Sequence, residues 1–178
     1  MKKLHLTTGK DSFRIAQQYI QVKDGHVLTT NSHVLVKFPL NEVFGENTRI
    51  EQTDEFYILG TDWKKQGFDK GCRFSKIDNQ LEAYDKKHNL IGIIKLINAD
   101  ELSIKGGGKY PNIDQVIPTS EPSEICSIGL NPGLLKDLCD CLGLTAYKLE
   151  FRGPNKIVMI KGNDSKAIAG IMPMATDW

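Results

Sequence analysis

The stretch Asn131-Pro-Gly-Leu-Leu-Lys-Asp-Leu-Cys-Asp-Cys-Leu-Gly143 gives the clearest helix signal in the chain. Asn131 is a favourable N-cap, Pro132 suits the first helical position, and Gly143 marks the expected end. Apolar residues recur at helical spacing along it and form one stripe, made of Leu134, Leu135, Leu138, Cys141 and Leu142. The stretch therefore predicts an amphipathic helix with one buried face.

Strand-like runs lie on both sides of this helix. We expect a strand over 125–130 before it, and two strands over 147–151 and 156–161 after it, joined by a tight turn. A short apolar segment, Ile171-Met-Pro-Met174, follows. Methionine is flexible and polarizable, and methionine-lined grooves suit partners of varied shape. Two interpretations stay open for this segment, a final core strand and part of a peptide-binding groove.

The order strand, helix, strand-turn-strand, strand occurs twice. The last copy spans 124–172, and an earlier copy spans 55–97. The earlier copy has a strand at 55–59, a short helix at 61–67 with Thr61 as N-cap and Gly67 as stop, and strands at 72–77, 80–84 and 90–97. Two copies of one unit predict a repeat architecture.

The first ~40 residues resemble a third copy that has lost its helix. Strand-like runs at 19–22 and 26–29 flank Asp24-Gly25, a strong hairpin signal, and a third run follows at 34–38. There is room for only one helical turn near 11–15, and another is expected at 41–44.

Composition limits the function classes. The chain has 178 residues, 40% of them hydrophobic, and a net charge of +1. One domain, or one domain and a partial one, is the natural expectation, and no global field attracts DNA or anionic membranes. No apolar run is long enough to span a bilayer, and the N-terminus does not read as a signal peptide. The cytoplasm is the expected compartment.

The cysteines do not predict a disulfide framework or a metal site. They are Cys72, Cys126, Cys139 and Cys141, and we expect reduced, small apolar side chains. Cys139 and Cys141 are two residues apart on a helix and point in different directions. The glycines at 106–108 lack the strand, helix start and Lys-Ser/Thr pair of a phosphate loop, so they predict a flexible loop. No metal and no cofactor are expected.

Four stretches resemble the bacterial DNA polymerase sliding clamp, the beta subunit. Thr29-Thr-Asn-Ser-His-Val-Leu35 is similar to the family's Ala-Thr-Asp-Gly-His-Arg-Leu motif, and Tyr110-Pro-Asn-Ile-Asp-Gln-Val-Ile-Pro118 resembles its inter-domain linker. The stretch 128–138 is similar to the strand and helix of its last half-domain, and Ile171-Met-Pro-Met174 matches its Val-Met-Pro-Met segment. The four occur in the family's order.

The resemblance implies an α+β DNA-clamp fold built from strand-helix-strand-strand-strand half-repeats, with antiparallel sheets and few short helices. Residues 1–118 would form a clamp-type domain whose first half-repeat lacks its helix, and 119–178 would form one further half-repeat. It implies no catalysis. A family chain has six half-repeats and this one has three, so several chains would be needed to close a ring around double-stranded DNA.

The resemblance also implies a binding site. In the family, the His-containing motif and the terminal Met-Pro-Met segment form the pocket for short peptides of polymerases, clamp loaders and repair proteins. The matching positions here are Thr30, Ser32, His33, Leu35, Ile171, Met172, Pro173 and Met174. Asn31-Ser32 replaces Asp-Gly and Val34 replaces Arg, and the chain ends Ala175-Thr-Asp-Trp178, where Trp178 could fold over the pocket.

The family's helices present basic residues to DNA phosphates. Lys64 and Lys65 on the helix at 61–67, and Lys136 on the helix at 132–142, are the matching candidates. Asp137 and Asp140 make the second helix mixed in charge, so a solvated surface is an equal interpretation.

Two alternatives to a clamp stay open. They are a peptide-binding competitor without a ring, from a phage or mobile element, and, as the weakest, a small thiol enzyme.

Overall fold

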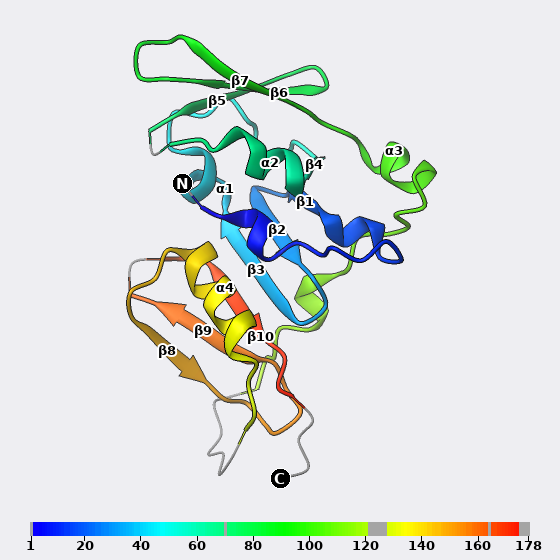
Figure 1. Cartoon of the computed structure of the whole chain (residues 1–178), viewed down its shortest axis with the longest axis vertical. Helices are drawn as coiled ribbons and strands as arrows, with labels where there is room; N and C mark the ends of the chain where they lie inside the picture. Colours follow the sequence, from blue (N-terminus) through cyan, green and yellow to red (C-terminus); the bar gives the residue numbers. More distant parts are fainter. Residues whose placement is uncertain (1, 70, 121–127, 164, 175–178) are drawn as a thin grey trace.

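The computed structural model describes residues 2–69, 71–120, 128–163 and 165–174, which form two antiparallel sheets and short helices (Figure 1). The larger sheet has the strand order β4-β1-β2-β3-β10-β9-β8, and the smaller sheet has the order β5-β6-β7. This is the α+β architecture that the sequence predicts.

The bounds of the elements follow the predicted runs closely. The larger sheet consists of β1 (Tyr19–Lys23), β2 (His26–Thr30), β3 (Val34–Pro39), β4 (Phe56–Leu59), β8 (Tyr147–Glu150), β9 (Val158–Gly162) and β10 (Ile168–Ile171). The smaller sheet consists of β5 (Arg73–Ile77), β6 (Gln80–Tyr84) and β7 (Leu90–Lys95). The α-helices are α1 (Leu40–Phe44), α2 (Gly60–Gln66), α3 (Ala99–Ile104) and α4 (Pro132–Leu142), and the 3-10 helices are η1 (Leu4–Leu6), η2 (Ile15–Gln18) and η3 (Ile113–Gln115).

The repeat is present in the structure. The second copy runs β4, α2, β5, β6, β7, and the third runs α4, β8, β9, β10. The first copy has β1, β2 and β3, and only η1 and η2 precede them. The assignment of this segment to a half-repeat that has lost its helix remains a prediction. Its hairpin turns at Asp24 and Gly25, which have φ of 48° and 70°, the left-handed values that a two-residue turn between antiparallel strands requires.

The first and third copies join edge to edge. β10 pairs antiparallel with β3, from Ile168 opposite Lys37 to Ile171 opposite Val34. Strands far apart in the sequence thus become neighbours in one continuous sheet. The predicted division at 118/119 lies in the segment before α4, and it remains a prediction.

Helices α2 and α4 cover one face of the larger sheet (Figure 1). On α4, Leu138, Cys141 and Leu142 are buried, as the apolar stripe predicts. The centre of the core is an aromatic cluster of Phe44, Trp63, Phe68 and Phe74, whose neighbouring ring centroids lie 5.2–6.1 Å apart. Aromatic pairs at such distances are favourable beyond the area that they bury.

The N-terminal segment occupies the space between α2 and α4. The Lys2 Nζ donates a hydrogen bond of 2.8 Å to the carbonyl of Leu142 at the C-terminal end of α4. A cation is favourable there because the last carbonyls of a helix carry partial negative charge. On the other side, Trp63 Nε1 of α2 donates to the Lys2 carbonyl at 3.2 Å. This short segment thus stabilises both α2 and α4, at the place where the first copy of the repeat has no α-helix of its own.

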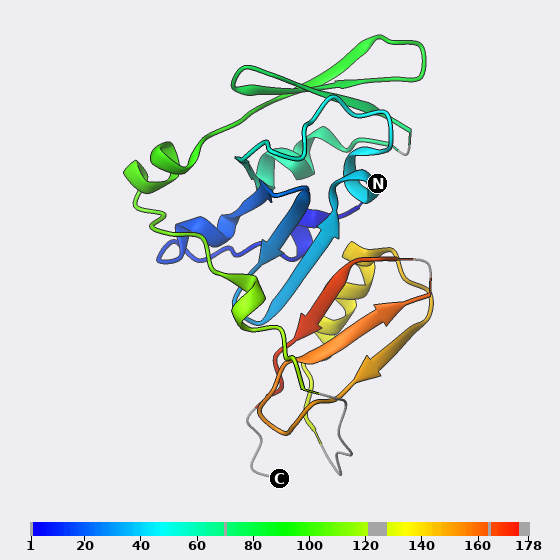
Figure 2. The same cartoon turned by 180° about the vertical axis from the view of Figure 1, so that it is seen from behind.

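Residues 98–118 cross the opposite face of the larger sheet, and we call this segment the strap (Figure 2). Tyr110 fixes it, since its buried hydroxyl lies 3.2 Å from the carbonyls of Tyr19 on β1 and Leu28 on β2. Burial raises the pKa of Tyr110 far above its ordinary value, so the phenol stays protonated and remains a donor. The strap and the sheet enclose a second apolar cluster, separate from the core under the helices.

Three local expectations need correction. Thr61 does not cap α2, because the helix already begins at Gly60 and no side chain caps it. Helix α3 was not predicted, although its capping box, Asn98 with Glu101, is visible in the sequence. Of the predicted strand at 125–130, residues 125–127 lie outside the described residues, and Gly129 forms only an isolated bridge with Met174.

One buried carboxylate should make stability depend on pH. Glu150 on β8 is 3.0 Å from the Lys161 Nζ and 3.2 Å from the Arg152 guanidinium. The hydrogen bond from Lys161 comes first among the contacts that hold the pKa of Glu150 below its ordinary value of 4.5. A carboxylate whose pKa is lowered by folding stabilises the fold at pH values above its ordinary pKa. This contribution is lost as the pH falls through the pKa of the folded state.

We therefore expect Glu150→Gln to be less stable than the natural protein at pH 7, and the difference to shrink steadily below about pH 4.5. Urea unfolding of both proteins at a series of pH values measures this. A difference that stays constant from pH 7 to pH 3 would contradict the assignment.

Candidate peptide-binding site

The two segments that the resemblance brings together do lie side by side. Val34 at the start of β3 is opposite Ile171 at the end of β10. The pairing continues beyond the strand, where the Met172 N–H donates to the His33 carbonyl at 2.7 Å. Met174 then forms a bridge with Gly129, through its N–H and the Gly129 carbonyl at 2.9 Å. The backbone of the candidate site is therefore fixed by sheet-type hydrogen bonds.

The alternation of side chains along a strand shows on which face of the sheet each residue lies. Val34 and Ile171 belong to the core under the helices, and Leu35 belongs to the cluster under the strap. Because successive side chains alternate between the faces, His33 and Met172 lie on the strap side with Leu35. Leu35 is buried and His33 is exposed, whereas the side chains of Met172 and Met174 are 39% and 47% exposed. The site is an apolar surface with a polar rim, and Pro173 lies half-buried between its two methionines.

A rigid turn holds the polar rim. The Thr30 hydroxyl donates to the Val34 carbonyl at 2.8 Å, and the Asn31 side chain accepts the N–H groups of His33 and Val34, each at 3.0 Å. Ser32 has a φ of 74°, a left-handed conformation that favours glycine. This explains the glycine of the resembling motif at this position. Here the Ser32 hydroxyl lies 2.7 Å from the Gln17 amide nitrogen, a contact that glycine could not make.

The Ser32 hydroxyl also contacts a positively charged side chain. Arg14, in the loop before η2, donates a hydrogen bond to it. The side chain of the adjacent Phe13 is 92% exposed. The loop before η2 thus brings an arginine to the turn, next in sequence to an exposed aromatic residue. The sequence analysis assigned neither residue to the site, and no motif marks them.

The strap supplies further apolar residues near the site. Ile113 and Ile117 pack in the same cluster as Leu35, and Ile157 and Met159 join them from the third copy. Gly170, opposite Leu35 on β10, allows this packing, because a Cβ there would lie 2.8 Å from the Ile157 side chain. The resemblance of residues 110–118 to the family's inter-domain linker was the sequence signal from which the position of the strap residues near this site could have been predicted.

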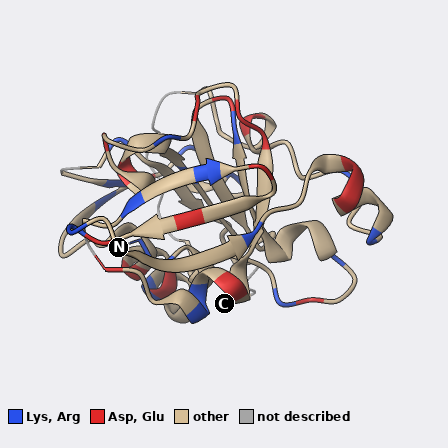
Figure 3. Ribbon diagram, turned by 90° about the horizontal axis from the view of Figure 1, so that it is seen from above, with Lys and Arg blue, Asp and Glu red and all other residues tan. Residues whose placement is uncertain are grey.

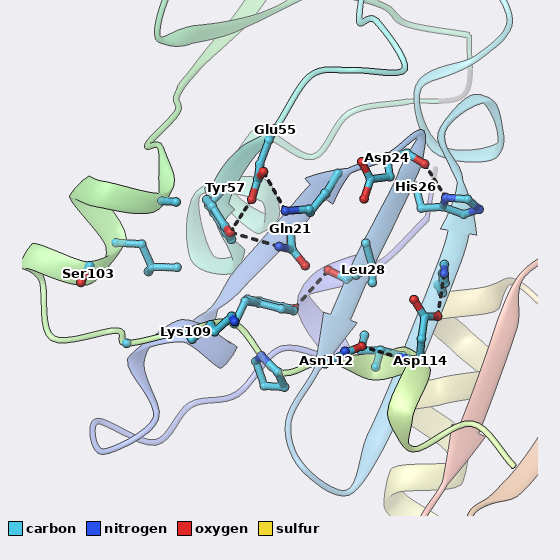
Figure 4. Close-up of a pocket in the computed structure, with 18 residues that line it drawn as sticks. Gln21, Asp24, His26, Leu28, Glu55, Tyr57, Ser103, Lys109, Asn112 and Asp114 are labelled. Carbon is cyan, nitrogen blue, oxygen red and sulfur yellow. Dashed lines mark hydrogen bonds and ion pairs between the residues drawn. The ribbon is translucent and has the colours of Figure 1, made fainter.

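A separate cavity of about 780 Å³ lies between the strap and the strands of the first two copies (Figure 4). On its floor Gln21 donates to the Tyr57 hydroxyl at 3.0 Å, and Lys23 pairs with Glu55 at 2.9 Å. The hydrogen bond with Glu55 raises the pKa of Lys23. The Glu55 carboxylate and the Lys23 ammonium thus satisfy each other.

The candidate DNA-contact lysines differ in their surroundings. Lys65 pairs with Asp62 at 3.4 Å, and Lys136 pairs with Asp140 at 2.8 Å, each within its own helix. Burial lowers the pKa of the His5 imidazole most, and the nearby cation of the exposed Lys64 lowers it further. Among the described residues, Lys64 is thus the candidate lysine for which no ion pair is found.

No metal site is evident in the described parts of the chain, and two of the cysteines are poorly suited to react. They contain no group of three or more His, Cys, Asp or Glu side chains that could hold a metal ion. Cys72, Cys139 and Cys141 are free, and Cys126 lies outside the described residues. Burial raises the pKa of Cys141 to about 11, and it raises that of Cys139 as well. A thiol is nucleophilic only as the thiolate, so both are poorly suited to catalysis.

Cys141 should therefore resist modification in the folded protein. We expect its labelling by a thiol reagent at pH 8 to be at least about 100-fold slower than in urea, because it is buried and protonated. Peptide mapping by mass spectrometry after timed labelling gives both rates. Fast labelling of Cys141 in the folded protein would revive the thiol-enzyme alternative.

Repeated strand-and-helix units, joined edge to edge into antiparallel sheets, define a DNA-clamp fold. Comparison with models of known protein families finds no match, and comparison with curated proteins finds none. Solved structures do match. The DNA polymerase sliding clamp of Bacillus subtilis superposes with a TM-score of 0.63 at 13% identity, over 98% of this chain and 60% of that one.

Two further clamps match equally well. The Helicobacter pylori beta clamp, solved with a DNA ligase peptide bound, has a TM-score of 0.62 at 12% identity, over 97% of this chain and 61% of that one. The DNA polymerase III beta chain of Streptococcus pneumoniae has a TM-score of 0.61 at 13% identity, over 99% of this chain and 64% of that one. The chain thus has the sliding-clamp fold and spans less than two thirds of these proteins' length. No helix of the described residues could cross a membrane.

Proposed function

We propose that this protein is a non-catalytic, sliding-clamp-like protein of DNA replication or repair that binds short peptides of polymerases or other clamp partners. One observation carries the proposal, the hydrogen bond of 2.7 Å between the Met172 N–H and the His33 carbonyl. It joins the two segments that the resemblance assigns to one pocket, and it leaves the Met172 side chain at the surface on the strap side. The compartment that we propose is the cytoplasm.

The chemistry of the surface suits an apolar peptide anchor. Met172 and Met174 provide flexible apolar area, and Leu35 provides a buried apolar floor. His33 adds an exposed imidazole at the edge, where a peptide needs polar partners, while the hydroxyls of Thr30 and Ser32 hold the turn that carries it. The Helicobacter pylori clamp of the same fold was solved with a peptide of DNA ligase, which makes a peptide the natural ligand to test.

Fluorescence anisotropy tests the proposal. A labelled peptide with a clamp-binding sequence is titrated with the full chain, beside a labelled peptide of the same composition in scrambled order. We expect saturable binding of the first peptide and at least about tenfold weaker binding of the second. Equal affinities, or no binding of either peptide, would show that the proposal is wrong.

Encirclement of DNA is the further part of this proposal, and it requires several chains because one chain has three half-repeats. Lys64 would then contact phosphates, so association with double-stranded DNA should be weak and fall steeply with salt. The alternative is a competitor that binds clamp-recognition peptides without a ring. The ion pairs of Lys65 and Lys136 favour it, since they neutralise two of the three candidate lysines. Binding to a closed DNA circle distinguishes the two.

A further inference from the structure

The cavity between the strap and strands β1, β2 and β4 is a second place where this protein offers unused binding groups (Figure 4). Its volume of about 780 Å³ lies within the range of roughly 300–1,000 Å³ that small-molecule sites occupy. Among the described residues that line it, none belongs to the proposed peptide site. A ligand in this cavity would therefore occupy a site of its own.

A chain of hydrogen bonds on the cavity floor fixes the direction of the Gln21 amide. The Lys23 Nζ donates to the Glu55 carboxylate at 2.9 Å, and the Tyr57 hydroxyl donates to the same carboxylate at 3.1 Å. Burial raises the pKa of Tyr57, so the phenol keeps its proton. Because that proton goes to Glu55, the hydroxyl can only accept from the Gln21 Nε2, 3.0 Å away. The Gln21 nitrogen therefore faces Tyr57, and the Gln21 oxygen does not.

The Gln21 amide has one acceptor and one donor left for a ligand. Gln21 is 7% exposed, yet its oxygen accepts no hydrogen bond from the part of the chain that the structure describes. Figure 4 shows this oxygen turned away from Tyr57. The nitrogen has a second N–H beside it. A buried amide without partners is unfavourable, so a ligand that presents an N–H next to an acceptor would stabilise it.

Apolar side chains from the sheet and from the strap line the same cavity. Leu28 of β2 and Leu102 of α3 are 8% and 1% exposed, and Pro111 follows the buried Tyr110 in the strap. Apolar side chains suit the faces of a planar ring, whereas an amide bonds to the edge of the ring. Glutamine recognises adenine in this way, through an amino group and a ring nitrogen. The cavity thus has the groups that a nucleobase needs.

The charges in the lining favour a ligand with one anionic group. Lys23 pairs with Glu55 at 2.9 Å. Lys37 pairs with Asp114 at 2.7 Å. Lys109 is exposed and has no ion pair with the described residues, so it is free to bind an anion. Figure 3 shows acidic and basic residues intermixed over the molecule, and the net charge is only +1, so the field of the whole protein does not favour a long polyanion.

We propose that this cavity binds a free nucleoside monophosphate, with an adenine-type base at Gln21 and the phosphate at Lys109. The exocyclic amine of the base would donate to the Gln21 oxygen, and the neighbouring ring nitrogen would accept the free N–H of the same amide. Leu28 and Leu102 would contact the ring. Lys109 would bind the phosphate as a compact positive charge. The proposal does not depend on the proposed peptide function, because the two sites share no residue.

Isothermal titration calorimetry of the natural full-length chain with adenosine monophosphate (AMP) tests the proposal. We expect saturable binding of AMP. The analogue with two methyl groups on the exocyclic amine can no longer donate, so it should bind at least about tenfold more weakly. Ribose 5-phosphate, which lacks the base, should show no saturable binding over the same concentrations. These comparisons use one protein and therefore do not depend on whether a variant folds.

Gln21→Leu tests the contact with the base. Leucine is similar in size to glutamine, and the substitution keeps the hydrogen bond from Tyr57 to Glu55 while it removes both amide groups. We expect the affinities for AMP and for adenosine to fall alike, by at least about tenfold. Circular dichroism checks that the variant is folded.

Lys109→Gln tests the contact with the phosphate. It should weaken the binding of AMP by about threefold to tenfold and leave the binding of adenosine unchanged, because adenosine has no phosphate. Lys105→Gln is the matched control, since Lys105 is also an exposed lysine of the strap but is not among the residues that line the cavity. It should bind both ligands as the natural protein does.

Three results would overturn the proposal. The first is a natural protein that does not bind AMP, or that binds AMP and the dimethylated analogue equally well. The second is a folded Gln21→Leu variant with natural affinity for AMP. The third is a short oligodeoxyadenylate that binds more tightly than AMP, which would assign the cavity to a nucleic-acid strand instead of a free nucleotide.

Discussion

Met172→Glu is expected to weaken peptide binding by about 30-fold or more, a loss of about 2 kcal/mol. The substitution keeps the backbone N–H that bonds to His33, so the sheet pairing remains. It replaces an apolar side chain by a carboxylate at the centre of the proposed contact surface. A bound apolar peptide would then bury an unpaired charge, which is strongly unfavourable. Anisotropy titration with the labelled clamp-binding peptide measures the loss.

Ile168→Glu is the matched control for this prediction. Ile168 lies on the same strand and, by alternation, on the same face as Met172, and its side chain is 37% exposed. It is opposite Lys37 at the other end of the β3–β10 pairing, where a carboxylate is tolerable. We expect its affinity for the peptide to change by less than about threefold. If both variants lose binding equally, the site does not lie at the methionine end of β10.

Phe74→Ala is expected to lower the free energy of unfolding by about 3–5 kcal/mol, the largest stability effect that we foresee. Phe74 is 1% exposed and touches three rings, with centroids 5.3 Å from Phe44, 5.2 Å from Phe68 and 6.1 Å from Trp63. These residues come from α1, α2, β5 and the segment after α2. Alanine would therefore leave a cavity where four segments meet, and neighbouring parts could not all move to fill it.

Urea unfolding followed by circular dichroism measures this loss, and Phe13→Ala is its control. The same two residue types are exchanged, but Phe13 is exposed, so its removal should change stability by less than about 0.5 kcal/mol. If Phe74→Ala were as mild as Phe13→Ala, the smaller sheet would not be held by the aromatic cluster. A large loss in both variants would mean that the Phe13 loop is part of the core.

Much of the fold could be predicted because it depends on local signals. The helix α4 begins at Asn131 and ends at Gly143 as its capping residues predict, and Leu138 and Cys141 are buried as the stripe predicts. The hairpin at Asp24-Gly25 follows from turn geometry alone. Helix α3 was missed because a run of only six residues has weak periodicity, although its capping box was present.

The candidate site could be predicted only in part. Thr30, Ser32 and His33 are candidates through a resemblance, and of these the structure brings His33 into contact with Met172. Arg14 carries no motif, and only the structure shows that it bonds to the Ser32 hydroxyl. The residues under the strap, such as Ile113 and Ile157, meet through packing between distant segments, which periodicity cannot reveal.

The sequence by itself determined most of the helices and strands and their order, because propensity, capping and turn geometry act over a few residues. Only the tertiary structure decided which strands became neighbours. Pairing of β3 with β10 brings together His33 and Met172, which are 139 positions apart in the sequence. The physical reason is that the backbone of one strand can form hydrogen bonds with any other strand whose apolar face fits the same core. Which strand becomes its neighbour therefore depends on the packing of the whole molecule.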